Sequence, residues 1–166
     1  MNSVAKVINE MMIFDCGDVK RINHFMKVYA FASAIGKMEE LDERTQSILE
    51  VAAVVHDIGV KVCEKKYGSC SGELQEKEGP ALAEQLLFRV GGFDNDFIER
   101  VSYLVGNHHS YTKIENNMDF QILVEADMLV NIDEEAVELP EIRRVERNIF
   151  RTEAGISFLQ NLYYEE

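Results

Sequence analysis

The chain has 166 residues, of which 46% are hydrophobic and 28% charged, so both length and composition are those of one folded globular domain rather than a disordered segment. Its 17 Lys and Arg against 30 Asp and Glu give a formal net charge of −13. Such a charge repels nucleic-acid backbones and anionic membrane surfaces, which argues against both as partners. A small phosphorylated substrate stays open, because a metal ion can reverse the local charge.

The sequence predicts a cytoplasmic protein. Lys6 and Glu10 interrupt the apolar content of residues 1–14, so no signal-peptide core is visible there. The most apolar run, residues 48–55, contains Glu50 and is too short to span a bilayer. The three cysteines include no CxxC pair, so neither a disulfide framework nor a cysteine zinc site is expected.

Apolar residues recur at helical spacing along the chain, and long alternating stretches are absent. The sequence therefore predicts an all-α fold, a single-domain helical bundle of about six or seven helices. Asp18, Asp42, Asp94 and Asp119 are suited to helix N-caps, and Pro80 suits a first helical turn. The expected helices cover about 3–14, 19–35, 43–57, 80–90, 95–109 and 119–132, with one or two more between 141 and 163.

The four histidines carry most of the functional information, because each lies on or at the end of an expected helix. His56 and Asp57 close the apolar helix at 48–55, and Asp127 stands among apolar neighbours. A buried ionisable group is costly unless it is paired or bound to a metal. Imidazole and carboxylate together suit a divalent ion, although these residue types do not distinguish Mn, Fe, Mg, Co, Ni and Zn. Taken singly, a histidine at a helix end more often packs or caps than binds metal.

Three segments taken in order make the metal interpretation more specific. Residues 21–28 include Arg21 and His24, residues 52–59 carry His56-Asp57 after an apolar lead-in, and residues 125–129 contain Asp127. Together they resemble the HD superfamily of metal-dependent phosphohydrolases. The resemblance implies one HD-type domain over residues 1–166, with a motif core at about 20–130 and C-terminal helices at 141–163.

The resemblance also implies a ligand set and a reaction. One tightly bound divalent ion would activate water to hydrolyse a phosphate ester or anhydride of a nucleotide or other small phosphorylated metabolite. Asp57 would both bind metal and serve as the catalytic residue that orients the attacking water. The implied metal ligands are His24, His56, Asp57 and Asp127.

Many members of the superfamily hold a second metal with additional histidines, and this chain matches that pattern in part. His108 and His109 resemble the later histidine position, whereas Glu78 stands where the earlier extra histidine is usual. A second ion held by Glu78 with His108 or His109 is the alternative to a single ion. These residues would otherwise contact the substrate, and the sequence does not indicate which histidine points inward.

Binding of a phosphate in so acidic a protein needs local cations. Arg21 lies one helical turn before His24, and Lys61, Lys65 and Lys66 follow the His-Asp pair in residues 60–77, which read as a long loop. We expect these four cations to contact the phosphate, with the loop as a substrate-contacting lid. A simple solvated loop is the alternative.

The C-terminal part reads as structural. The charged residues between 134 and 147 are expected to form a solvated helix face, with Glu134 among them. The apolar residues between 156 and 163 are expected to pack on the domain, and a homodimer in which they cover a second subunit is the alternative. Two other functions also stay open: a di-iron HD-type oxygenase, and a non-catalytic metal- or nucleotide-binding regulatory module.

Overall fold

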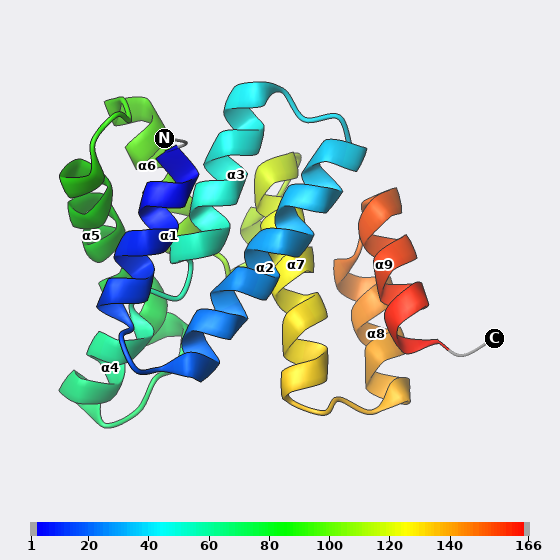
Figure 1. Cartoon of the computed structure of the whole chain (residues 1–166). Coiled ribbons are helices and arrows are strands. Elements are labelled where there is room, and N and C mark those ends of the chain that lie inside the picture. Colours follow the sequence, from blue (N-terminus) through cyan, green and yellow to red (C-terminus); the bar gives the residue numbers. More distant parts are fainter. Residues whose placement is uncertain (1–2, 165–166) are drawn as a thin grey trace.

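Helices form all the regular secondary structure in residues 3–164, the part of the chain that this computed structural model describes (Figure 1). The predicted all-α, single-domain bundle is confirmed, with nine α-helices over those residues where six or seven were expected. The helices are α1 (Ser3–Phe14), α2 (Val19–Met38), α3 (Glu43–Val55), α4 (Val60–Tyr67), α5 (Gly72–Val90), α6 (Asn95–Val105), α7 (Met118–Glu134), α8 (Leu139–Ile149) and α9 (Glu153–Tyr163), with a short 3-10 helix at Tyr111–Lys113.

Side-chain caps set the starts of several helices. The carboxylates of Asp18, Asp42 and Asp94 accept hydrogen bonds from backbone N–H groups in the first turns of α2, α3 and α6, as predicted. The prediction for Asp119 is wrong, because α7 begins one residue earlier. The Asp119 carboxylate instead accepts two hydrogen bonds from the Arg100 guanidinium, at 2.6 and 2.8 Å. A bidentate guanidinium satisfies the carboxylate better than a single backbone N–H.

The prediction of a loop over residues 60–77 is wrong. Helix α4 and the first turns of α5 occupy most of it. Gly68 ends α4 with a φ of 71°, and Ser71 caps α5 by accepting a hydrogen bond from the Leu74 N–H. Residues 73–78 are mostly strong helix formers, so α5 starts early and runs through Pro80 despite the hydrogen bond that proline cannot donate.

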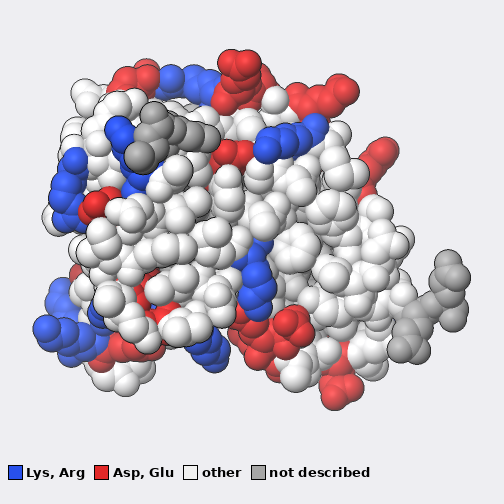
Figure 2. Space-filling view, viewed as in Figure 1, with Lys and Arg blue, Asp and Glu red and all other residues white. Residues whose placement is uncertain are grey.

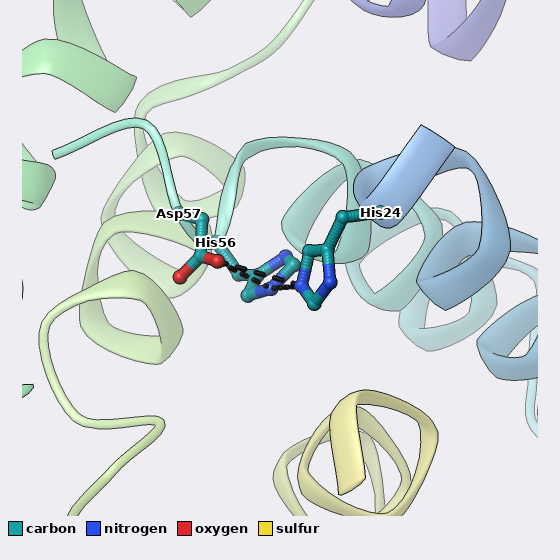
Figure 3. Close-up of side chains that lie close together, drawn as sticks. All are labelled: His24, His56 and Asp57. Carbon is teal, nitrogen blue, oxygen red and sulfur yellow. Dashed lines mark hydrogen bonds and ion pairs between the residues drawn. The ribbon is translucent and has the colours of Figure 1, made fainter. Parts of the chain in front are cut away.

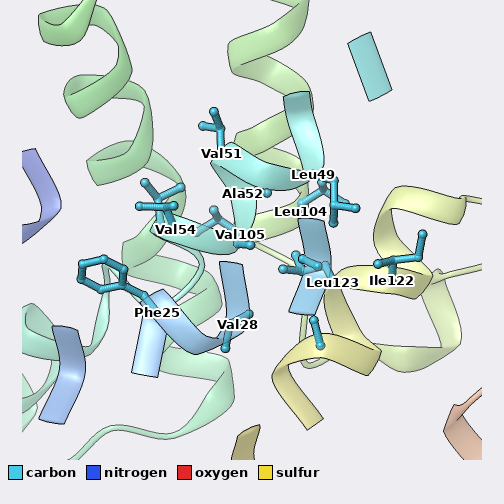
Figure 4. Close-up of a cluster of buried hydrophobic side chains, with 14 of the residues drawn as sticks. Phe25, Val28, Leu49, Val51, Ala52, Val54, Leu104, Val105, Ile122 and Leu123 are labelled. Atoms are coloured by element: carbon cyan, nitrogen blue, oxygen red, sulfur yellow. The ribbon is translucent and has the colours of Figure 1, made fainter. Parts of the chain in front are cut away.

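Helix α3 lies at the centre of the bundle. It packs against α2, α6 and α7, and the five residues from Val51 to Val55 are fully buried. Figure 4 shows apolar side chains of α3 packed among those of α2, α6 and α7. A helix segment that is apolar on all sides, as the last turn and a half of α3 is, belongs in the interior of a bundle. Its C-terminal end therefore delivers His56 and Asp57 into the protein rather than to its surface.

The C-terminal helices α8 and α9 form a hairpin that packs against α7 and α2 (Figure 1). The buried carboxylate of Glu125 on α7 fastens this hairpin, because it accepts hydrogen bonds from the backbone N–H groups of Arg151 and Thr152 at 2.7 and 3.0 Å. Leu159 of α9 is fully buried, and Ile156, Phe158 and Tyr163 pack partly buried against the core, whereas Leu162 is half exposed. Most of the apolar tail therefore packs on its own domain.

Charge is distributed unevenly over the surface. The face drawn in Figure 2 is largely uncharged at its centre and carries acidic and basic side chains around its rim. None of the helices described between residues 3 and 164 is long and apolar enough to cross a membrane.

Candidate metal centre

Four side chains from separate parts of the sequence meet where α2, α7 and the end of α3 come together. His24 lies on α2, His56 and Asp57 directly follow α3, and Asp127 lies on α7. The Nε2 atoms of His24 and His56 are 3.2 Å apart. His24 Nε2 is 3.3 Å from Asp127 Oδ1 and 3.4 Å from Asp57 Oδ2. His56 Nε2 is 3.5 Å from each of the same two oxygens. Figure 3 shows His24, His56 and Asp57 pointing toward one another.

Hydrogen bonds on the far side of each ring fix which nitrogen faces the centre. His56 donates its Nδ1–H to the Ala53 carbonyl at 2.8 Å, and His24 donates its Nδ1–H to Glu134 Oε2 at 2.8 Å. The Nε2 atoms are thereby directed inward as electron-pair donors. A histidine whose second nitrogen is held by a carboxylate or a carbonyl is the usual form of a metal-binding histidine.

The donor set fits a divalent cation. Asp127 Oδ1 is buried and no described residue hydrogen-bonds to it, although the Nε2 atoms of His24 and His56 face it at 3.3 and 3.5 Å. The donors whose ligand atoms all lie within 4.8 Å of one another are His24, His56 and Asp57, and Asp127 joins them through its contacts with the two imidazoles. Ligand atoms about 2.1 Å from one ion lie roughly 3.0–3.5 Å from each other. The separations of 3.2–3.5 Å found between the two Nε2 atoms and the two carboxylate oxygens match that spacing.

A second group of donors lies on the other side of Asp57. Asp57, His108 and His109 have ligand atoms within 4.8 Å of one another, as do His24, His56 and Asp57. His108 Nε2 is 3.4 Å from Asp57 Oδ1, whereas Oδ2 of the same carboxylate faces His24 and His56. His108 is oriented like His56, since its Nδ1–H is donated to the Val105 carbonyl at 2.9 Å. One carboxylate thus faces both donor groups.

The ionisation of the cluster shows that it attracts positive charge. Burial alone lowers the pKa of His24, but its contact with Asp127 and the charges of Asp57 and Glu134 outweigh burial and raise that pKa to about 9. Burial opposes ionisation of Asp127 as well, yet the imidazoles of His24 and His56 hold its pKa well below the usual range. Without a metal the cluster therefore holds protons that a divalent cation would replace.

The site lies in a pocket of about 420 Å³. Residues from α1, α2, α4, α5 and α7 line it, and its acidic lining residues outnumber the two lining cations, Lys20 and Arg21. His109 and Gln75 also line it, and the His109 Nε2–H donates to Gln75 Oε1 at 3.0 Å. An anionic substrate entering so acidic a pocket needs bound metal to balance the charge.

Comparison with known proteins bears on this arrangement. No family model matches the sequence, and no curated protein matches it significantly. Among solved structures, the crystal structure of a predicted HD superfamily hydrolase from an uncultured Thermotogales bacterium is similar. It has a TM-score of 0.65 and 25% sequence identity, and the match covers 98% of this chain and 84% of that one.

This chain has the HD-domain fold. The match extends over nearly the whole chain, C-terminal helices included. The similarity supports a hydrolase in general, and the buried His and Asp group of this HD domain is able to hold a metal ion.

Glu78 does not reach the HD-domain donor groups. Its Oε1 accepts hydrogen bonds from Lys66 Nζ at 2.8 Å and from the Tyr67 hydroxyl at 2.6 Å, and neither group of metal-compatible donors includes it. One turn earlier on α5, Gln75 faces His109 instead. The geometry therefore does not support Glu78 as a ligand of a second ion. If a second ion binds, the structure offers Asp57, His108 and His109 for it.

Of the four cations expected at the phosphate, only Arg21 lines the pocket. Its guanidinium is paired with Asp18 at 3.4 Å and with Glu64. Lys61, Lys65 and Lys66 lie on α4, outside the lining. Lys61 donates to the Phe14 carbonyl at 2.6 Å and Lys66 to Glu78, so helix formation over 60–67 turns both toward other partners.

The sequence analysis missed Glu134, which it assigned to a solvated helix face. Glu134 instead accepts a hydrogen bond from His24 and pairs with Lys27 Nζ at 2.8 Å. Its spacing was informative, because Glu134 follows Asp127 by two helical turns and so shares its face of α7. Lys20 was also missed, and only its place in the pocket lining reveals it.

Proposed function

We propose that the protein is a metal-dependent phosphohydrolase that cleaves a phosphate ester or anhydride of a nucleotide or other small phosphorylated metabolite. The observation that carries the proposal is that the inward-facing Nε2 atoms of His24 and His56 lie 3.2 Å apart and that each lies 3.3–3.5 Å from one oxygen of Asp57 and one oxygen of Asp127. His24, Asp57 and Asp127 line a pocket. His24, His56, Asp57 and Asp127 are the proposed metal ligands. Such a donor set suits the transition metals and Mg²⁺ rather than Ca²⁺.

A divalent ion bound there would lower the pKa of a coordinated water and neutralise charge on a phosphoryl oxygen. The chain's own residues prepare that chemistry. Glu134 holds the ring of His24, and the Ala53 carbonyl holds that of His56, so both imidazoles are fixed before substrate arrives. Preorganised donors of this kind cost no rearrangement at the moment of reaction.

Asp57 is the proposed catalytic residue because its two oxygens face the two donor groups. Burial opposes its ionisation, but His56 and His108 lower its pKa to about 2, so it is a carboxylate at neutral pH. As an acceptor it can orient an attacking water. Burial and the neighbouring His108 lower the pKa of His109, so its imidazole is neutral at pH 7. Its Nε2–H is donated to Gln75, which leaves Nδ1 as an electron-pair donor for a metal ion or a substrate hydroxyl.

Arg21 is the proposed phosphate ligand. It lines the pocket one turn from His24 and would exchange its pairing with Asp18 and Glu64 for the substrate phosphate. Lys20 lines the same pocket and is the second cation available. We further propose that the substrate is a free small molecule, since the formal charge of −13 disfavours nucleic-acid polymers and anionic membranes.

The test combines elemental analysis of the purified protein with phosphate release from a panel of nucleotides and other phosphate esters, with Mn²⁺, Mg²⁺, Co²⁺ or Ni²⁺ added. We expect bound metal and phosphate release in the wild type. Asp57→Asn and Asp127→Asn should each reduce metal binding and phosphate release. The reduction should exceed the factor of about 10–100 that is typical when a residue hydrogen-bonded to a metal ligand is removed. Asp133→Asn is the matched control, because this carboxylate lies on α7 with Asp127 but has 74% of its side chain exposed.

Two results would redirect the proposal. A pair of bound irons with dioxygen-dependent product formation and no phosphate release would favour the oxygenase, for which Asp57, His108 and His109 supply the second donor group. A folded protein that binds nucleotide, binds no metal and hydrolyses no phosphate would instead be a regulatory module. Equal phosphate release by Asp57→Asn and the wild type would remove Asp57 from the chemistry.

A further inference from the structure

One buried carboxylate in the pocket takes no part in the metal centre. Asp15 stands in the turn between α1 and α2 and is only 4% exposed. No described residue donates a hydrogen bond to its side chain, and its Oδ1 is fully buried without a partner. Asp15 nevertheless lines the pocket that contains His24 and Asp57. A buried acceptor that the protein leaves unpaired calls for an explanation.

The neighbouring cations are committed elsewhere. Arg21 is paired with Asp18 and Glu64, and Lys61 donates to the Phe14 carbonyl. No ion pair joins either of them to Asp15 within the described part of the chain. Asp15 thus has positive charges near enough to influence it but none in contact.

The ionised form of Asp15 is a cost to folding. Burial raises the pKa of its carboxyl, and the charges of Arg21 and Lys61, which act the other way, do not cancel this effect. Asp18 and Asp57 add to the increase. A leucine or asparagine of similar size would fill the same space without that cost. The backbone of Asp15 helps to hold the turn, because its carbonyl accepts a hydrogen bond from the Asp18 N–H at 2.8 Å, but its carboxylate adds no hydrogen bond to it. The pocket is the place from which a partner for that carboxylate could come.

The surroundings of Asp15 indicate the chemistry of that ligand. Met11, Phe25, Val54 and Val60 add apolar surface to this acidic pocket. Asp18, Glu64 and Glu134 line it too but are paired with Arg21 or His24, whereas the carboxylate of Asp15 is unpaired and available to a ligand. A carboxylate only accepts hydrogen bonds, so it selects for a ligand that carries an O–H or N–H donor. A ligand without such a donor leaves the buried carboxylate unpaired and binds much more weakly.

We propose that Asp15 is a specificity-determining residue that accepts a hydrogen bond from the leaving group of the substrate. The proposal rests on the proposed phosphohydrolase function. It narrows the substrate to phosphate esters whose alcohol portion carries a hydroxyl or ammonium donor, and it excludes plain alkyl phosphates as good substrates.

The test uses alkyl phosphates of two to six carbons that end in methyl, hydroxyl or ammonium, with the metal-loaded wild type. The chain length scans the reach from the phosphate to Asp15. We expect kcat/KM to favour the hydroxyl or ammonium ester over the methyl ester of equal length by at least tenfold at the best length, mainly through KM. The two donor-bearing series show whether the natural donor is neutral or charged.

Two variants identify Asp15 as the cause. In Asp15→Leu the preference for a donor should fall to about one, and in Asp15→Asn the ammonium should lose its advantage more than the hydroxyl. Asp96→Leu is the matched control, because Asp96 is an exposed acid in the first turn of α6 and should leave the preference intact. A preference that persists unchanged in both Asp15 variants would overturn the inference while phosphate release upheld the hydrolase.

Urea unfolding supplies a readout that does not depend on turnover. Both Asp15 variants should unfold at the same or a higher urea concentration than the wild type at pH 7, since an unpaired buried charge is removed. A clear decrease in the midpoint for both would mean that Asp15 has a structural partner and would overturn the inference. Absence of phosphate release from every ester by the wild type would overturn the proposed function and this inference with it.

Discussion

The metal-free protein should become less stable as the pH rises from 6.5 to 9. The pKa of His24 lies at about 9 in the folded protein, above its ordinary value of 6.5. A group whose pKa is raised by folding stabilises the fold while it is protonated. Its contribution is complete below pH 6.5 and is lost as the pH passes through about 9.

The size of the effect follows from the same two values. Since one pH unit corresponds to about 1.4 kcal/mol, protonation of His24 stabilises the folded protein by roughly 3 kcal/mol. The pKa of His56 is also raised, so it contributes in the same direction. Asp57 and Asp127 have lowered pKa values and titrate at acidic pH, and the pKa of His109 is lowered below 6.5. None of these three groups therefore changes the free energy of unfolding much between pH 6.5 and 9.

The assay is urea unfolding in the presence of a chelator at pH 6.5, 7.5 and 9. The free energy of unfolding should fall by about 3 kcal/mol across the series. His24→Gln removes the main titrating group and should flatten most of this dependence. All four histidines of the chain belong to this site, so no distant imidazole titrates in the same range.

Saturating metal should remove the decrease in the free energy of unfolding with rising pH. A metal ligand must lose its proton before it binds, so affinity rises with pH, and binding free energy adds to the folded state. The stability gained from metal should therefore increase between pH 6.5 and 9, over the range in which the metal-free protein weakens. A metal-free protein whose stability is constant or rises across this range would refute the reasoning about His24.

Three further predictions concern groups outside the direct ligand set. Glu134→Gln should weaken metal binding by about 10–100-fold in a competition titration, because the His24 ring loses the carboxylate that orients it; unchanged affinity would contradict that role. Glu125→Ala should lower the free energy of unfolding by about 3 kcal/mol, since it strands buried backbone donors between α8 and α9. Arg44→Ala should leave the urea midpoint nearly unchanged in the same experiment, because its pair with Asp94 is exposed; a clear decrease in the midpoint would show that the pair contributes more than its exposure suggests.

The sequence by itself predicted the fold class, and its resemblance to the HD superfamily named the residues that the structure brings together as candidate metal ligands. Helical spacing of apolar residues is a local property, and so are the caps at Asp18, Asp42 and Asp94. His56-Asp57 could be placed at the interior because the five residues before them, Val51 to Val55, are all apolar. These inferences needed only the order of the residues, and the structure agrees with them.

Tertiary structure decided the rest. Nothing local to Glu78 reveals that Lys66 and Tyr67 occupy its carboxylate. Helical spacing places Glu134 on the face of α7 that carries Asp127, but only the packing of the helices shows that it meets His24 across 110 residues of chain. The vacant acceptor of Asp15 is equally invisible, because it depends on Arg21 being drawn toward Asp18 and Glu64. Backbone propensity acts over a few residues, whereas the partner of a buried charge is whichever side chain the packing of the helices brings within about 4 Å. The sequence therefore indicated which side chains are candidates for a metal site, and the packing of α2, α4 and α7 decided which of the charged side chains meet and which stay unpaired.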